Sequence, residues 1–380
     1  MLFPLNIGYV VGELGRGGAE LQLLQLCEGL INRGHHVRVR TYGGTAVLDE
    51  HFRSVGVDVS TVRATTRSHK VQVIRSWMRE VDLDVVHGIL RSASTVALLA
   101  RGRSSRPTLI ASDYSEAAYE RWSLQLMASL VLFGRANAVV TEVDINKRSL
   151  ESKAPWLRGK THLIRNGLDS ERFVPATPAA DRDDSVFVFC CVGTLSDVKN
   201  PGRVVDAVEE LTRRGHTGFM VDWYGRDSLE EARNVGPQVR ETVQAHGLSP
   251  HIVFHGDVAD IERAYQRSDA LVHASVREGF PNAVAEGMAC GLPIVVSRVS
   301  DLPHVVKEAR NGFVFDETDP RSIADAMERL MQLPRRERFE MGVRSRALAV
   351  RWFDRERFFD DVEQLYLSLV PVGDGRRPAA

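Results

Sequence analysis

Residues 269–297, DALVHASVREGFPNAVAEGMACGLPIVVS, decide the fold because they alternate strand and helix patterns within one short segment. The apolar run that opens the segment predicts a buried strand, and the run IVVS at its end predicts the next one. Between them a helix is expected to begin at Asn282, a good N-cap residue, and to end at the Cys-Gly pair. The segment therefore reads as a strand, loop, helix and strand of a parallel sheet.

The same alternation continues along the whole chain and is typical of doubly wound α/β folds. Stretch 174–184, VPATPAADRDD, has no periodicity and separates two such patterns. We predict two Rossmann-like domains, 1–173 and 174–352, followed by a helix at 353–370 that returns toward the first domain and a disordered tail at 371–380. Strands are expected at 6–11, 37–41, 85–87, 109–111, 138–141 and 162–164, and then at 186–192, 219–224, 252–255, 270–274, 294–297 and 313–315.

Composition is that of a globular protein: 380 residues, 43% hydrophobic and 26% charged. No apolar run approaches the roughly 18 residues of a membrane span, and the N-terminus lacks a basic leader, so a cytoplasmic location is expected. The first 170 residues hold 22 Lys and Arg against 16 Asp and Glu, whereas the remainder holds 27 against 34. A basic half suits an anionic acceptor or an acidic membrane surface, and it equally suits an ordinary solvated surface.

Cysteine and metal-ligand patterns are uninformative about chemistry. The four cysteines lack paired spacing and are interpreted as small buried hydrophobic residues: Cys27, Cys190, Cys191 and Cys290. No cluster of His, Cys, Asp and Glu has the spacing of a structural zinc site. We therefore expect no metal site. We also expect no cofactor and no nucleic-acid partner.

Ligands of open α/β sheets bind beyond the carboxyl ends of the strands, so the loops there carry the candidate chemistry. The loop 12–20, GELGRGGAE, enters a helix near Gly18, where glycines and exposed amides favour a phosphate. It lacks the dinucleotide spacing, and no acid closes the next strand, which disfavours nicotinamide binding. A tight turn without a ligand is the alternative.

Two carboxylates bracket the helix start within the first quoted segment. Glu278 lies in the loop, Glu286 lies about one turn into the helix, and the amides of residues 280–283 lie between them. This pattern favours an anion flanked by polyols, with Glu286 on a ribose and Glu278 on sugar hydroxyls. Taken alone, a solvated loop acid and a helix-capping acid would explain the same pair.

The segment EGFPNAVAEGMACGLPIV, with Glu278 and Glu286 in it, resembles the signature of the family-four retaining glycosyltransferases of the GT-B superfamily. Further motifs resemble the family in the expected order: GGAE at 17–20, DVVH at 84–87, RNGLD at 165–169, Lys199–Asn200, HGDV at 255–258 and NGFVF at 311–315. The resemblance implies a GT-B fold of two domains facing across a cleft. The first domain would bind the acceptor and the second the nucleotide sugar.

The resemblance also implies a donor site carried mainly by the second domain. Glu278 would contact the transferred sugar, Glu286 the ribose, and Lys199 the phosphates. The candidate catalytic residues are Glu278, Lys199 and Asp113. The candidate donor-binding residues are Glu286, Gly17, Gly18, Phe280, Pro281, Asn282, Ala283, Thr194, Gly225, Arg226, His255 and Asn166.

The chain departs from the family pattern at three places. Thr194 stands where an Arg usually accompanies the phosphate-binding Lys, so Arg226 or another base supplies that charge, or the phosphates are held less tightly. Asp113 follows the strand after which many relatives carry a His, and it is a candidate contact for sugar or acceptor. The motif VSDLPH, which ends at His304, replaces the usual Gly-Gly-x-Pro-Glu.

Three histidines have competing interpretations. His87 ends a strand and would orient the acceptor, or it is a strand-end residue with internal hydrogen bonds. His273 is expected in the core because of strand alternation. For His255 we favour a functional interpretation.

The implied activity is retaining, metal-independent transfer of a hexose-type sugar from a nucleoside diphosphate to a glycan or lipid-linked acceptor, as in bacterial surface polysaccharide synthesis. UDP and GDP donors are not distinguished. An epimerase or phosphorolytic enzyme, and a non-catalytic nucleotide-sugar binder, are the alternatives. The apolar helix expected at 115–134 either contacts the inner face of a membrane or covers the sheet of the first domain.

Overall fold

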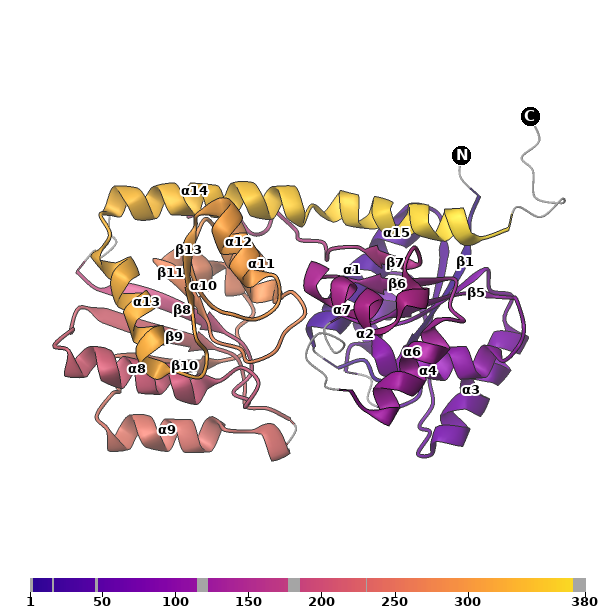
Figure 1. Cartoon of the computed structure of the whole chain (residues 1–380), viewed down its shortest axis with the longest axis horizontal. Coiled ribbons are helices and arrows are strands. Elements are labelled where there is room, and N and C mark those ends of the chain that lie inside the picture. Colours follow the sequence, from indigo (N-terminus) through magenta and orange to yellow (C-terminus); the bar gives the residue numbers. More distant parts are fainter. Residues whose placement is uncertain are drawn as a thin grey trace. The chain divides into compact units, whose positions relative to one another are not determined.

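The chain forms two compact units, shown in a computed structural model that describes residues 3–15, 17–44, 47–114, 122–176, 185–229 and 231–371 (Figure 1). Unit 1 comprises Met1–Gly167 and Arg355–Ala380, and unit 2 comprises Leu168–Asp354. The chain thus passes from unit 1 to unit 2 between Gly167 and Leu168, whereas the first domain was expected to end at residue 173. The Phe173 ring packs against Tyr265 with centroids 6.2 Å apart, so this stretch belongs with unit 2.

Unit 1 contains a seven-stranded parallel sheet in the order β3-β2-β1-β4-β5-β6-β7. Its strands are β1 (Asn6–Val11), β2 (His36–Thr41), β3 (Asp58–Thr61), β4 (Val85–Gly88), β5 (Thr108–Ser112), β6 (Ala138–Thr141) and β7 (Thr161–Leu163). The sequence prediction missed β3 because only Val59 of this short edge strand is fully buried. A strand with one buried side chain lacks the apolar run that identifies interior parallel strands.

The helices of unit 1 cover this sheet, and the last of them comes from the far end of the sequence (Figure 1). They are α1 (Gly18–Asn32), α2 (Asp49–Ser54), α3 (Arg67–Glu80), α4 (Leu90–Arg101), α6 (Leu124–Phe133), α7 (Asp144–Lys153), the 3-10 helix η1 (Pro155–Leu157) and α15 (Arg355–Leu369). Of the apolar helix expected at 115–134, residues 115–121 lie outside the described residues, as does 372–380 of the expected tail.

Helix α15 is part of the core of unit 1. Its Phe359 ring lies against the backbone of α1, where a Cβ built on Gly29 would meet the ring at 2.5 Å. The hydroxyl of buried Tyr366 forms a hydrogen bond of 3.0 Å with the hydroxyl of Tyr9 in β1. Glu363 bonds the imidazole of His35 at 2.8 Å. Apolar and polar contacts together therefore attach α15 to the first half of the unit.

Unit 2 contains a six-stranded parallel sheet in the order β10-β9-β8-β11-β12-β13. All six predicted strands are present: β8 (Phe187–Val192), β9 (Phe219–Tyr224), β10 (Ile252–Gly256), β11 (Ala270–His273), β12 (Ile294–Ser297) and β13 (Gly312–Phe315). The helices are α8 (Pro201–Arg213), η2 (Glu231–Arg233), α9 (Gly236–Ala245), α10 (Ile261–Arg267), α11 (Asn282–Ala289), α12 (Leu302–Ala309), α13 (Pro320–Gln332) and α14 (Arg335–Trp352).

Burial follows the sequence pattern in both units. The four cysteines are buried and free, as predicted. Among the residues that the structure describes, no helix combines the length and apolar character that crossing a bilayer requires. Because all strands of each sheet are parallel, their carboxyl ends meet at one edge, and the loops that hold the candidate residues start there.

We expect Gly29→Leu to lower the stability of unit 1, because its side chain would overlap the Phe359 ring. Overpacking of this kind costs about 1–3 kcal/mol. Gly202→Leu in α8 is the matched control, since nothing lies within 4 Å of a Cβ built there. Scanning calorimetry should show a lower unfolding temperature for the first variant only. Equal behaviour of the two variants would contradict the packing of α15 on α1.

Candidate functional site

An ion pair joins the loops that follow two neighbouring strands of unit 2. Lys199 lies in the loop after β8, and Glu278 lies in the loop after β11. The Lys199 Nζ donates to Oε1 of Glu278, and the two side chains are only 26% and 15% exposed. The structure thus brings two of the three predicted catalytic residues together at the carboxyl edge of the sheet.

Backbone contacts fix the positions of these two loops. The amide of Val276 donates to the carbonyl of Val198 at 2.9 Å, which links the loops directly. Next to Lys199, Asn200 adopts a left-handed conformation with φ of 59°. Asn tolerates this region better than most residues, and the Asn200 amide donates to the carbonyl of Ala274 at 3.2 Å. Lys199 is therefore presented from a constrained turn.

His273 is a third member of this cluster. It is the last residue of β11 and is buried, as predicted, but its Nε2 lies 3.4 Å from Oε1 of Glu278. Burial lowers the pKa of His273, although Glu278 opposes this. Strand alternation indicated a core position and could not show which side chain the ring would meet. The one available signal was its place at the carboxyl end of a strand.

The charges around Glu278 keep it ionised. Burial alone would raise the pKa of this carboxyl, but the ammonium of Lys199 and the nearby imidazole of His273 outweigh burial and hold the pKa well below its usual range. Glu278 is therefore an acceptor of hydrogen bonds at neutral pH and not an acid.

Helix α11 begins beside this cluster. The helix starts at Asn282, but the N-cap is Pro281 and no side chain caps it, so the prediction that Asn282 is the cap was wrong. The first amides of a helix have no intrahelical acceptor, so the turn at 280–283 presents backbone donors. Buried Phe280 packs on Phe353 with ring centroids 4.6 Å apart, which anchors this turn.

Glu286 lies further along α11 and is bonded by a tyrosine of α10. The Tyr265 hydroxyl donates to Oε2 of Glu286 at 2.8 Å, and Tyr265 is itself completely buried. Burial raises the pKa of Glu286, and this hydrogen bond opposes the rise. Among the residues that the structure describes, Tyr265 is the side chain that donates a hydrogen bond to this carboxylate, and it does so at Oε2. Sequence reasoning did not identify Tyr265.

The ends of β8, β9 and β10 pack closely enough to require glycine. The amide of Gly225 donates to the carbonyl of Gly256 at 2.8 Å. A Cβ on Gly225 would lie 2.1 Å from the carbonyl oxygen of Gly193, and the φ of Gly225 is +140°. Any larger residue would separate these strand ends. The predicted donor-binding residue Gly225 thus has a structural role in addition.

Three further candidates lie at or near these strand ends. His255 stacks on Tyr224, with ring centroids 4.6 Å apart, and shares a hydrogen bond of 2.8 Å with Asp222. Arg226 forms an ion pair of 3.1 Å with Asp257, so its charge already has a counter-ion. Thr194 donates to the hydroxyl of Ser196 at 3.4 Å.

The remaining candidates belong to unit 1, at the carboxyl edge of its own sheet. Helix α1 begins at Gly18, as predicted, and its N-cap is Gly17. A Cβ on Gly17 would lie 2.3 Å from Oε2 of Glu20, so this carboxylate occupies the helix start. The side-chain amide of Asn166 donates to Glu142 at 2.6 Å.

His87 and Asp113 are both buried in unit 1. The ring nitrogens of His87 bond Tyr366 at 2.7 Å and Ser112 at 2.6 Å, and burial lowers its pKa to about 3. Arg91 Nε donates a hydrogen bond of 2.7 Å to Oδ2 of Asp113, and the guanidinium forms an ion pair with the same carboxylate, 2.6 Å from Nη2 to Oδ2. These contacts match the interpretation of His87 as a strand-end histidine with internal hydrogen bonds.

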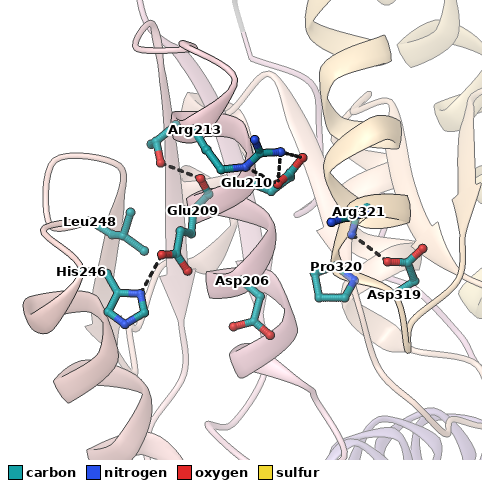
Figure 2. A pocket seen from close by; sticks show the side chains of 10 residues that line it. Asp206, Glu209, Glu210, Arg213, His246, Leu248, Asp319, Pro320 and Arg321 are labelled. Carbon is teal, nitrogen blue, oxygen red and sulfur yellow. Dashed lines mark hydrogen bonds and ion pairs between the residues drawn. The ribbon is translucent and has the colours of Figure 1, made fainter.

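A separate hollow of about 610 Å³ lies on unit 2 between α8 and the start of α13 (Figure 2). Its polar groups bond one another: Glu209 pairs with His246 at 2.9 Å, and Glu210 pairs with Arg213 at 2.8 Å. None of the predicted site residues lines it. We therefore place the candidate site at the carboxyl edge of the sheet and not in this hollow.

Comparison with known proteins agrees with this architecture. The structure is similar to the crystal structure of Anabaena HepE in complex with UDP and glucose, with a TM-score of 0.81 and 18% identity over 95% of this chain and 99% of that one. The fold is accordingly that of the GT-B glycosyltransferases.

Family models match both halves of the sequence. "Glycosyltransferase Family 4" matches residues 16–172, and "Glycosyl transferases group 1" matches residues 186–333. The chain therefore belongs to the family-four glycosyltransferases.

Two curated relatives illustrate the family. A Nocardioides D-inositol 3-phosphate glycosyltransferase is 25% identical over 88% of this chain and 82% of its own length. The GDP-mannose-dependent alpha-(1-6)-phosphatidylinositol monomannoside mannosyltransferase of Mycolicibacterium smegmatis is 26% identical over 88% of this chain and 91% of its own.

We expect Lys199→Met to invert the pH dependence that Glu278 gives to stability. In the wild type the pKa of Glu278 lies below its unfolded value of about 4.3, so the ion pair stabilises the fold above that pH and is lost as the pH falls. Without the ammonium, burial raises the pKa of Glu278 above the unfolded value, and stability is then lost as the pH rises.

The expected loss at pH 7 is about 2 kcal/mol, less than the roughly 3–5 kcal/mol of a fully buried pair because Lys199 is 26% exposed. Urea unfolding at pH 4 and pH 7 measures it. Lys307→Met, at an exposed position of α12, is the control. If the free energy of unfolding of Lys199→Met changed with pH in parallel with that of the wild type, the ion pair would not stabilise the fold.

Proposed function

We propose that this family-four glycosyltransferase moves a hexose-type sugar from a nucleoside diphosphate to a glycan or lipid-linked acceptor, with retention at the anomeric carbon. The observation that carries the proposal is the ion pair between Lys199 and Glu278 beside the start of α11. A cation and a carboxylate then lie together at the carboxyl edge of one sheet, next to the first turn of the helix that carries Glu286. These are the groups needed for phosphates and for sugar hydroxyls.

Each residue has a role in this proposal. Lys199 neutralises the diphosphate, and the turn at 280–283 donates backbone hydrogen bonds to it. Glu286 accepts hydrogen bonds from the ribose through Oε1, while Tyr265 orients it. Glu278 is ionised and accepts a hydrogen bond from the transferred sugar.

In the proposed reaction, no side chain of the protein forms a bond to the sugar or takes the acceptor proton. The acceptor hydroxyl attacks the anomeric carbon on the face that the diphosphate leaves. The bond between that carbon and the phosphate oxygen breaks, and the departing oxygen takes the acceptor proton. Lys199 and the helix amides stabilise the charge that develops on the leaving group. Glu278 holds the sugar and forms no bond to it.

The proposal leaves His87 and Asp113 out of the chemistry. Their polar atoms bond Tyr366, Ser112 and Arg91 inside unit 1. Breaking such buried contacts to reach a substrate costs about 1–3 kcal/mol each. Positive charge for the leaving group comes from Lys199, so the proposed reaction is metal-independent.

The acceptor class rests on the family and on one relative. The Mycolicibacterium enzyme named above acts on a phosphatidylinositol mannoside, a lipid-linked glycan. We extend that class to this chain and propose peripheral contact with the inner face of a bacterial membrane, in surface glycoconjugate synthesis.

We expect Glu286→Ala to raise the KM for the donor about tenfold, because one ribose contact is lost. Lys199→Ala should instead lower kcat about 100-fold, because its charge acts chiefly on the departing diphosphate. Steady-state kinetics in EDTA, with the anomeric configuration of the product read by NMR, measures both. Glu209→Ala, in the hollow of Figure 2, is the matched control. Wild-type kinetics in both site variants, or inversion of configuration, would refute the assignment.

The donor nucleotide is accessible to a binding experiment. A ligand that binds only the folded chain raises the unfolding temperature. We expect a thermal-shift screen to show stabilisation by UDP or GDP and none by the corresponding monophosphates at equal concentration, because Lys199 and the α11 amides contact the diphosphate. Glu286→Ala should lower the shift. Equal shifts from mono- and diphosphates would argue against the phosphate site.

A further inference from the structure

The outward face of α6 in unit 1 is apolar. Leu124 is 86% exposed, Met127 49% and Val131 62%, and the spacing of these residues places them on one side of the helix. The opposite side is buried in the core of unit 1 through Leu126, Leu130 and Phe133. The helix therefore covers the sheet with one side and presents a second apolar side outward.

An ordinary surface helix carries charged residues on its outer face. The sequence of α6, LQLMASLVLF, contains no charged residue at all. Three large aliphatic side chains within about two turns form a patch, whereas scattered exposed hydrophobic residues would need no explanation. This face is therefore built to be covered.

Two exposed indoles flank the patch. Trp122, which is 61% exposed, precedes the helix by two residues. Trp156 is 52% exposed, and its Nε1 donates to the carbonyl of Leu130 at 3.1 Å, which places it beside the second half of α6. We call Trp122, Leu124, Met127, Val131 and Trp156 the α6 face. Tryptophan at the margin of an apolar surface is typical of the boundary between lipid tails and headgroups.

Positive charge gathers just beyond the C-terminal end of α6. Lys160 donates to the carbonyls of Gly134 and Ala136 at 3.1 and 3.2 Å. Arg101 and Arg135 also bond only neutral acceptors among the residues that the structure describes. No carboxylate of that described part neutralises these three cations, so the surface there suits an anionic partner.

We propose that the α6 face docks on the surface of an anionic lipid bilayer. Its aliphatic side chains enter the headgroup boundary, the indoles lie at that boundary, and the neighbouring cations meet anionic headgroups. A second protein chain would also cover the apolar side, but the indoles and the uncompensated cations favour lipid. The purpose of membrane docking rests on the proposed function, because docking would keep unit 1 near the lipid-linked acceptor proposed there.

Vesicle flotation of the full chain tests this inference. Wild-type protein should float with phosphatidylglycerol vesicles, bind phosphatidylcholine vesicles weakly, and lose binding as salt is raised. Leu124→Glu and Val131→Glu should each lower the partition coefficient at least about tenfold, because each replaces an apolar side chain that would leave water with a charged one. Phe339→Glu in α14, at a position 71% exposed, is the matched control and should float like the wild type.

A thermal shift with nucleoside diphosphate, measured on the same variants, separates this inference from the proposed function. Retention of the shift with loss of flotation supports membrane docking. Absence of wild-type flotation overturns it, as does a stable dimer in sedimentation that Leu124→Glu dissociates. Loss of the nucleotide shift in wild-type protein would count against the proposed function and leave the flotation result interpretable.

Discussion

The ion pair between Lys199 and Glu278 is the interaction on which the site depends. Each charge lies largely out of water, and an isolated buried charge is far more costly than a matched pair. The two loops must therefore be formed together, which requires that β8 and β11 are neighbours in the sheet. The hydrogen bond between Val276 and Val198 meets the same requirement in the backbone.

Two carboxylates on one short segment have opposite electrostatic surroundings. A cation and an imidazole hold the pKa of Glu278 low, whereas burial beside a neutral tyrosine raises the pKa of Glu286. Such divergence is typical of sites in which two acids have different tasks. The turn at the start of α11 lies between them and joins the two environments.

Much of the architecture could be predicted because it depends on local pattern. Apolar runs identified every strand of unit 2, and the glycine-rich turn identified the start of α1 at Gly18. Edge strand β3 was missed because a largely exposed strand needs no apolar run. The contacts of His273, and the role of Tyr265, could not be predicted because both depend on partners brought close only by the tertiary fold.

Unit 1 is discontinuous in sequence, since residues 355–369 complete its core after all of unit 2 has intervened. During synthesis on the ribosome, α1 therefore emerges long before the helix that covers Gly29 exists. Unit 2 is continuous in sequence, so it can finish folding while the apolar surface of unit 1 that α15 covers is still exposed. The apolar surface of the first half can therefore be covered only after residues 355–369 have been synthesised, and until then that half is the part most exposed to aggregation.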